Sequence, residues 1–261
     1  MTSKYYIKNV NPNIDLLGNV EIAVGDVIFD WTPFEIPRGT AALTEVTAKV
    51  AGLNGADVTG ARDIELYFAK SVSGAAPPTL GDTGSATTGI VTTAARPYFI
   101  GHNLMDGSGI KGGANLISWS HWSMSGKAGN DVENVRVLLE NEDIYPGTTP
   151  GYQTIWVAGL AATDVFDFGT DVALNQAGHQ AIDTSAVDLV TSGTDPRLVF
   201  AIGDEVVSFV ASDGSSPKQV GTVTAIADNV SLEVDAVAEA FNHTTELCNR
   251  NPIKFKFGFT Y

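Results

Sequence analysis

The sequence predicts an all-β protein, an antiparallel β-sandwich or barrel of jelly-roll type with at most one or two short helices. Short runs rich in β-branched and aromatic residues alternate apolar with polar positions, which is typical of strands with one buried face. Gly, Pro, Asn and Asp bound these runs, and 27 glycines and 11 prolines suit a fold with many turns. Helical periodicity is rare.

The first two thirds of the chain contain most of these runs. In 64–69, Ile64, Leu66 and Phe68 share one face, because successive residues of a strand point to opposite sides. The same alternation occurs in three further segments: 20–29, 135–139 and 155–157. With 44% hydrophobic residues, the chain can fill a sizeable core. We therefore predict a main β domain over 1–190, with extended arms and loops.

A second unit is expected over 191–236. Its apolar runs, 205–210, 219–227 and 230–234, are separated by the turn sequences SDGSSP and ADN and predict a three-stranded meander. A meander of this size can hardly bury a core alone. It should therefore be inserted in the larger β domain or be docked on it.

The last part, 237–261, is predicted to form a short helix and a strand that returns to the main domain. Apolar residues follow Asp235 at helical spacing, and Asp235 suits the N-cap position. In the ending NPIKFKFGFTY, every second residue from Ile253 to Tyr261 is apolar. We expect Phe255, Phe257 and Phe259 to be buried in a core or against a neighbouring subunit, while the lysines between them protect the strand from unwanted pairing.

Charge and composition restrict the partners. The chain has 30 acidic and 15 basic residues, a formal charge of −15, and no basic cluster, so no nucleic-acid partner is expected. No run of about 18 apolar residues and no secretory signal stand out, so we expect no membrane partner. The single cysteine, Cys248, gives no disulfide framework and fits folding in a cytoplasm.

None of the motifs that could indicate a catalytic, cofactor-binding or metal site occurs in the sequence context that such a site needs. The GSGIKG sequence at 107–112 is followed by no helical pattern, which a dinucleotide-binding loop needs. Ser120 and His121 are neighbours on a predicted strand and point to opposite faces, so they cannot form a nucleophile and base pair. The four histidines show no metal-ligand spacing, and the acidic turns do not match a calcium loop. We predict no cofactor, no metal and no enzymatic activity.

Several segments are instead candidates for contacts with other chains. Residues 71–97 and 103–115 are long, glycine-rich or proline-rich connections, and connections of this length often contact a neighbour. The N-terminal segment and the terminal strand add aromatic and apolar side chains. The candidate interface residues are Tyr5, Tyr6, Ile7, Ile110, Lys111, Phe255, Phe257, Phe259 and Tyr261.

Three stretches together carry a resemblance: DVIFDWTPFEIPRGTAALTEVTAKV, DIELYFAKSVSGAAPPTLG and the later GDEVVSF with VGTVTAI. In this style of Thr-, Ala- and Gly-rich strands, the chain resembles virion structural proteins of tailed bacteriophages. The resemblance implies a protein that folds in the host cytoplasm and becomes part of the virion. There it would act as a capsid decoration (cement) protein or a tail component, as a homo-oligomer, with a trimer favoured, bound to the major capsid or tail protein.

An alternative function uses the aromatic residues. Trp119, Trp122, Trp156 and Tyr152 could serve as stacking platforms for carbohydrate beside acidic loops, as in a receptor-binding tail component. Aromatic residues in strands belong to a core more often than to a ligand site. The burial of these side chains therefore distinguishes the two hypotheses.

Overall fold

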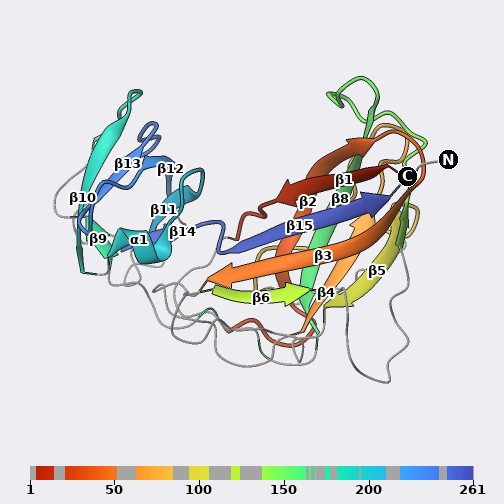
Figure 1. The fold of residues 1–261 in the computed structure, drawn as a ribbon, viewed down its shortest axis with the longest axis horizontal. Helices are drawn as coiled ribbons and strands as arrows, with labels where there is room; N and C mark the ends of the chain where they lie inside the picture. Colours follow the sequence, from red (N-terminus) through yellow and green to blue (C-terminus); the bar gives the residue numbers. More distant parts are fainter. Residues whose placement is uncertain are drawn as a thin grey trace.

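The computed structural model describes residues 4–14, 21–51, 63–84, 94–105, 119–123, 137–162, 165, 168, 174–176, 181–193, 195–209, 218–240 and 246–260. These residues form two antiparallel sheets that face each other in a sandwich, and a separate closed barrel (Figure 1). The prediction of an all-β protein with at most one or two short helices is confirmed, and the described residues contain one, α1.

The first sheet contains the beginning and the end of the chain. Its strand order is β1-β15-β3-β6, and β7 also pairs with β3. All its pairings are antiparallel. The strands are β1 (Tyr5–Val10), β3 (Ala41–Ala51), β6 (Trp119–Ser123), β7 (Val137–Leu139) and β15 (Ile253–Thr260).

The second sheet packs against the inner face of the first. Its strand order is β2-β8-β4-β5, again antiparallel throughout. The strands are β2 (Val27–Pro37), β4 (Ile64–Ala69), β5 (Phe99–Met105) and β8 (Tyr152–Ala161). The predicted alternation in 64–69 is correct, because Ile64, Leu66 and Phe68 are fully buried.

The barrel closes in the order β10-β13-β12-β11-β14-β9. The three strands of the predicted meander are present as β11, β12 and β13, but β9, β10 and β14 complete the barrel, so this unit extends beyond 191–236 on both sides. Its elements are β9 (Leu174–Gln176), β10 (Val187–Gly193), α1 (Pro196–Val199), β11 (Glu205–Phe209), β12 (Lys218–Ala225), β13 (Ser231–Val234) and β14 (Glu246–Asn249).

The helix predicted after Asp235 is wrong. Val237 instead forms an isolated bridge with Asp183, and residues 246–249 are strand β14, which pairs with β11. Leu247 and Cys248 are both buried although they point to opposite faces of the strand. A strand covered on both faces has no alternation of apolar and polar residues, and here its apolar positions happen to match a helical period.

Phenylalanines from both sheets fill the centre of the sandwich. Phe255, Phe257 and Phe259 of β15 point inward and are 2%, 0% and 0% exposed, so their predicted burial is confirmed. Phe257 stacks on Phe34 of β2 at a centroid distance of 5.5 Å and meets the edge of Phe68 of β4 at 6.0 Å. The terminal strand therefore closes the core of its own chain.

A buried polar network joins the barrel to the sandwich. The Asp204 carboxylate, 1% exposed, accepts hydrogen bonds from Ala201 N and Asn249 Nδ2 and forms an ion pair with Lys254 at the start of β15. Asn251 accepts from Glu205 N at 2.8 Å and donates to Pro12 O at 3.1 Å. A buried polar group is tolerated only when it is hydrogen-bonded, so this network fixes the barrel to the end of β1 and the start of β15.

Candidate interface at the open edge of the sandwich

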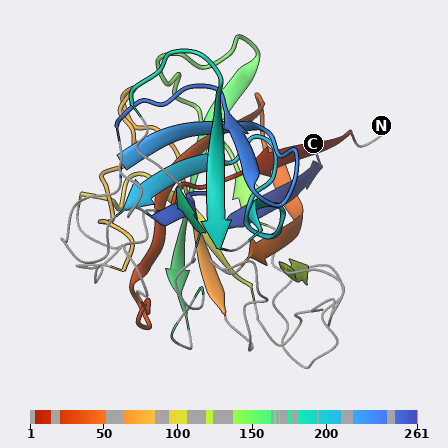
Figure 2. The same cartoon turned by 90° about the vertical axis from the view of Figure 1, so that its left-hand side faces the viewer.

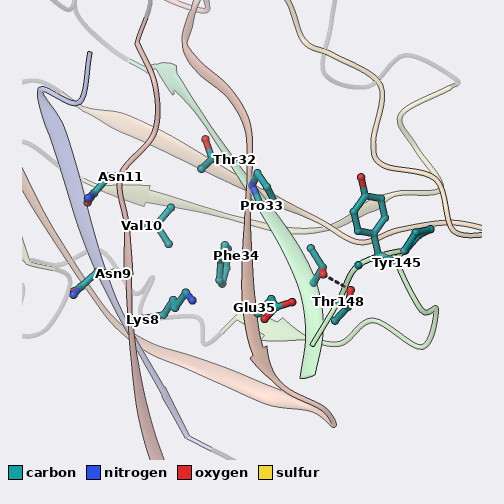
Figure 3. A pocket seen from close by; sticks show the side chains of 13 residues that line it. Lys8, Asn9, Val10, Asn11, Thr32, Pro33, Phe34, Glu35, Tyr145 and Thr148 are labelled. Atoms are coloured by element: carbon teal, nitrogen blue, oxygen red, sulfur yellow. Dashed lines mark hydrogen bonds between the residues drawn. The ribbon is translucent and has the colours of Figure 1, made fainter. Parts of the chain in front are cut away.

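β1 and β2 are the edge strands on the same side of the sandwich, one from each sheet. A groove of about 440 Å³ lies between them, and Figure 3 shows its side chains. The lining residues are Lys8, Asn9, Val10, Asn11, Thr32, Pro33, Phe34, Glu35, Tyr145, Pro146, Gly147, Thr148 and Thr154. The groove is therefore lined by both polar and apolar groups of the two edge strands.

The groove has an apolar floor and charged sides. Val10 and Phe34 are both 4% exposed and belong to the core, whereas Lys8 and Glu35 are partly exposed on opposite walls. Glu35 Oε1 accepts a hydrogen bond from Thr149 N at 2.7 Å. The bonds from the Thr149 backbone and side chain, with a smaller contribution from the Lys8 charge, lower the pKa of Glu35 below its usual value.

The turn before β8 forms the third wall. Tyr145 packs edge-on against Trp156 at a centroid distance of 4.8 Å, and Trp156 is 3% exposed. The hydroxyl groups of Thr148 and Thr154 lie 2.6 Å apart in a hydrogen bond, drawn as a dashed line in Figure 3. These contacts join this wall to β8.

The free edge of β2 is protected. The segment 78–84, predicted to be part of a long arm, lies along it: Gly84 N donates to Val27 O at 2.8 Å and Trp31 Nε1 donates to Pro78 O at 2.9 Å. The other half of β2 contains Pro33 and Pro37, which have no N–H to offer to an added strand. Covering and proline are two common ways of blocking a sheet edge.

The free edge of β1 has neither form of protection in the described structure. Its sequence, YYIKNV, contains no proline, and Tyr5 and Ile7 are each 52% exposed. Tyr5 lies over Gly258 of β15 and donates a hydrogen bond from its hydroxyl group to Glu45 Oε2 of β3 at 3.1 Å. Desolvation and this carboxylate raise the pKa of Tyr5. Tyr6 points the other way and packs against the core.

The structure thus separates the predicted interface residues into three groups. Tyr5, Tyr6 and Ile7 lie together on the edge strand β1. Phe255, Phe257 and Phe259 are enclosed in the core of the chain, so their assignment to a contact between subunits is wrong. Ile110, Lys111 and Tyr261 lie outside the described residues.

The residues of the predicted carbohydrate platform are divided between the two sheets. Trp156 is buried, and Tyr152, 37% exposed, lies in the same strand of the second sheet. Trp119 and Trp122 belong to β6 of the first sheet, where their backbones pair with Ala51 and Ala48. An aromatic group that the sequence did not reveal lies on β4 and β5 instead: the rings of Tyr67, Phe99 and His102 are within 6.5 Å of one another. Only the strand register brings these rings together, so no local motif could have revealed them.

Two further observations concern the described residues. They contain no group of three or more His, Cys, Asp or Glu side chains that could hold a metal ion. None of the helices among them has the length and apolar character needed to cross a membrane.

Comparisons with known proteins identify no family for this chain. No protein-family model and no curated protein match the chain. Among solved structures, it is similar to a chain described as "Crystal Structure of the STIV MCP", with 9% identity over 99% of this chain and 96% of that chain and a TM-score of 0.14. A TM-score this low transfers neither fold nor function.

Proposed function

We propose that the chain is a structural protein of a tailed-phage virion, a capsid decoration (cement) protein that binds the shell through repeated protein–protein contacts and catalyses no reaction. The observation that carries this proposal is the contrast between the two edge strands. β2 is covered and interrupted by prolines, whereas no described segment covers the free edge of β1, and Tyr5 and Ile7 are exposed on the outer face of this strand. An open sheet edge promotes unwanted aggregation of a protein that works alone, but it provides a binding surface for a protein that assembles.

Assembly also agrees with the charge of the chain. A net charge of −15 discourages nonspecific clumping of free copies in the host cytoplasm, where we propose that the protein folds before it joins the virion. Apolar contacts at the β1 edge would then provide the specific attraction, because the centre of a stable interface is usually apolar.

A binding experiment with phage shells tests this proposal. Purified chain is mixed with shells that lack it and sedimented, and the bound fraction is measured as a function of concentration. Saturable binding that Ile7→Asp abolishes is expected. Leu104→Asp is the matched control, since Leu104 is 45% exposed but lies on β5, at the opposite edge of the sandwich. No binding to any shell, or equal loss with both variants, would contradict a role for β1 in decoration.

A tail or receptor-binding component that recognises carbohydrate is the second candidate. One observation favours it: Phe99 is 39% exposed, the His102 side chain is 59% exposed, and both lie beside the Tyr67 ring on the outer face of the second sheet. The Glu65 carboxylate contacts His102 Nδ1 at 3.2 Å and adds an acceptor. Binding of host polysaccharide that Phe99→Ala removes, with no affinity for shells, would favour this function over decoration.

A further inference from the structure

The outer face of the first sheet is basic, although the protein is strongly acidic. On this face β1, β3 and β15 carry three lysines, Lys49, Lys254 and Lys256, and one carboxylate, Glu45, because Lys8 of β1 lines the groove instead. Lys49 and Lys256 are exposed on the outer face, which is turned toward the viewer in Figure 1. The charge of Lys254 is offset by Asp204, and Glu45, which keeps its charge when Tyr5 donates to it, offsets one of the other two lysines. Among the described residues of these three strands, one positive charge of this face therefore remains.

The same face carries the exposed apolar residues of β1. Asn9 pairs with Lys256 and Ile7 with Gly258, so Ile7 is a diagonal neighbour of Lys256 on one surface. Tyr5 extends the apolar part over Gly258. We define the basic face by the residues Tyr5, Ile7, Lys49 and Lys256.

The barrel has a surface of the opposite kind. Asp188 of β10 lies directly opposite Glu233 of β13, a cross-strand pair of like charges that is unfavourable in an isolated chain. Val190, 55% exposed, lies beside this pair on the same face, because it pairs with Ser231 of β13. We define the acidic face by the residues Asp188, Val190 and Glu233.

Positive charge is scarce around the acidic face. The described residues between 181 and 240 contain nine carboxylates and two basic side chains, Arg197 and Lys218. Arg197 forms an ion pair with Asp195 at 2.6 Å, and Lys218 lies at the start of β12, where it pairs with Ser208. Neither therefore neutralises the pair formed by Asp188 and Glu233, and an external basic surface would relieve their repulsion.

The two faces cannot meet within one chain. β10 lies on the side of the barrel that is turned away from the sandwich, and Figure 2 looks onto this end of the molecule with β10 in front. The buried network around Asp204 and Asn251 holds the barrel in this position. A second copy of the chain, however, can place its acidic face on the basic face of the first.

We propose that copies of this protein associate head to tail, with the acidic face of one barrel docked on the basic face of the next sandwich. The acidic face combines Val190 with two carboxylates, and the basic face combines Tyr5 and Ile7 with two lysines, so the contact is complementary in both respects. Such a heterologous contact produces a ring if the rotation closes and a filament if it does not. This inference rests on the proposed structural role and names the partner surface.

Charge reversal with complementation tests the inference. The first variant combines Lys49→Glu with Lys256→Glu, and the second combines Asp188→Lys with Glu233→Lys. Masses are measured by sedimentation velocity over a range of concentration and salt, and melting curves confirm that each variant folds. The wild type should form oligomers that dissociate as salt rises, and each variant alone should associate at least about tenfold more weakly.

The mixture of the two variants decides the question. Each variant alone has two faces of like charge. In the mixture the native acidic face of the first variant meets the native basic face of the second, and the two reversed faces are again opposite in charge, so association should return. Arg38→Glu and Glu21→Lys, which reverse exposed charges elsewhere on the sandwich, should leave association unchanged. A wild type that is monomeric throughout, variants that still oligomerise alone, or a mixture in which association does not return would overturn the proposal. A chain that decorates shells as a monomer would overturn this inference and leave the proposed function intact.

Discussion

Phe257→Ala is the substitution for which the structure gives the clearest expected magnitude. The Phe257 ring is 0% exposed and has four aromatic neighbours, at centroid distances from 5.5 to 6.3 Å: Phe34, Phe68, Phe255 and Phe259. Removing a buried phenylalanine ring costs about 3 to 5 kcal/mol when the surroundings cannot collapse into the space. Here the neighbours belong to both sheets, so the cavity cannot close without moving the sheets, and we expect the upper part of this range.

The position of the tryptophans makes the assay specific for the sandwich. All four, Trp31, Trp119, Trp122 and Trp156, lie in strands of the two sheets, and none lies in the barrel. Unfolding in guanidinium chloride, followed by tryptophan fluorescence, therefore reports on the core that contains Phe257. The midpoint should fall with little change in slope, and the melting temperature should fall by roughly 6 to 20 °C.

A matched control and a clear contrary result complete this prediction. Phe99→Ala removes an equal ring that is 39% exposed on β5, so it should cost less than about 1 kcal/mol. A loss below about 1 kcal/mol for Phe257→Ala as well would show that the ring does not lie between the two sheets. The packing described for the terminal strand would then be wrong.

Three further predictions follow from particular contacts. Gly159→Ala should cost about 1 to 3 kcal/mol in a denaturant titration, because the new Cβ would lie 2.2 Å from the ring of Phe29, which is fully buried. Lys254→Met should cost about 3 to 5 kcal/mol in the same titration, since it leaves the buried carboxylate of Asp204 without its cation. For Glu35, whose pKa is lowered in the folded state, the stabilising contribution is present above the unfolded value of about 4.3 and is lost as pH falls through the folded pKa. The difference in melting temperature between wild type and Glu35→Gln should therefore shrink from pH 7 to pH 3, and a constant difference would contradict the role of its hydrogen bonds.

The sequence predicted those parts of the fold that follow from local alternation. The strand 64–69, the three strands between 205 and 234 and the inward direction of Phe255, Phe257 and Phe259 each depend on a period of two along one strand. A single buried face is enough to produce this pattern. In these strands, the burial of one face accounts for the alternation of apolar and polar residues in the sequence.

Other features depend on pairings between distant segments. The barrel closes through β9, β10 and β14, whose partners are far along the chain, and β14 is covered on both faces, so its pattern suggested a helix. The covering of β2 by 78–84 depends on backbone hydrogen bonds of a proline-rich segment. Such bonds depend little on side-chain identity, so no sequence motif predicts them.

The candidate interface was likewise predictable from the sequence only in part. Tyr5 and Ile7 were predicted as contact residues from their position near the N-terminus, and the structure places them on an open edge. The acidic face arises only from the register of β10 and β13, which sets Asp188 opposite Glu233. In the sequence these two residues are simply separate acidic positions in two strands.

The number of copies of this chain in purified virions tests the structural role most directly. Quantitative mass spectrometry of particles, with labelled peptides from the chain and from the major capsid protein as standards, gives the ratio of the two proteins. A decoration protein should be present at a fixed ratio to the major capsid protein in every preparation, and at many copies per particle. A chain that is absent from the particles, or present only at a variable trace level, would contradict the proposed function.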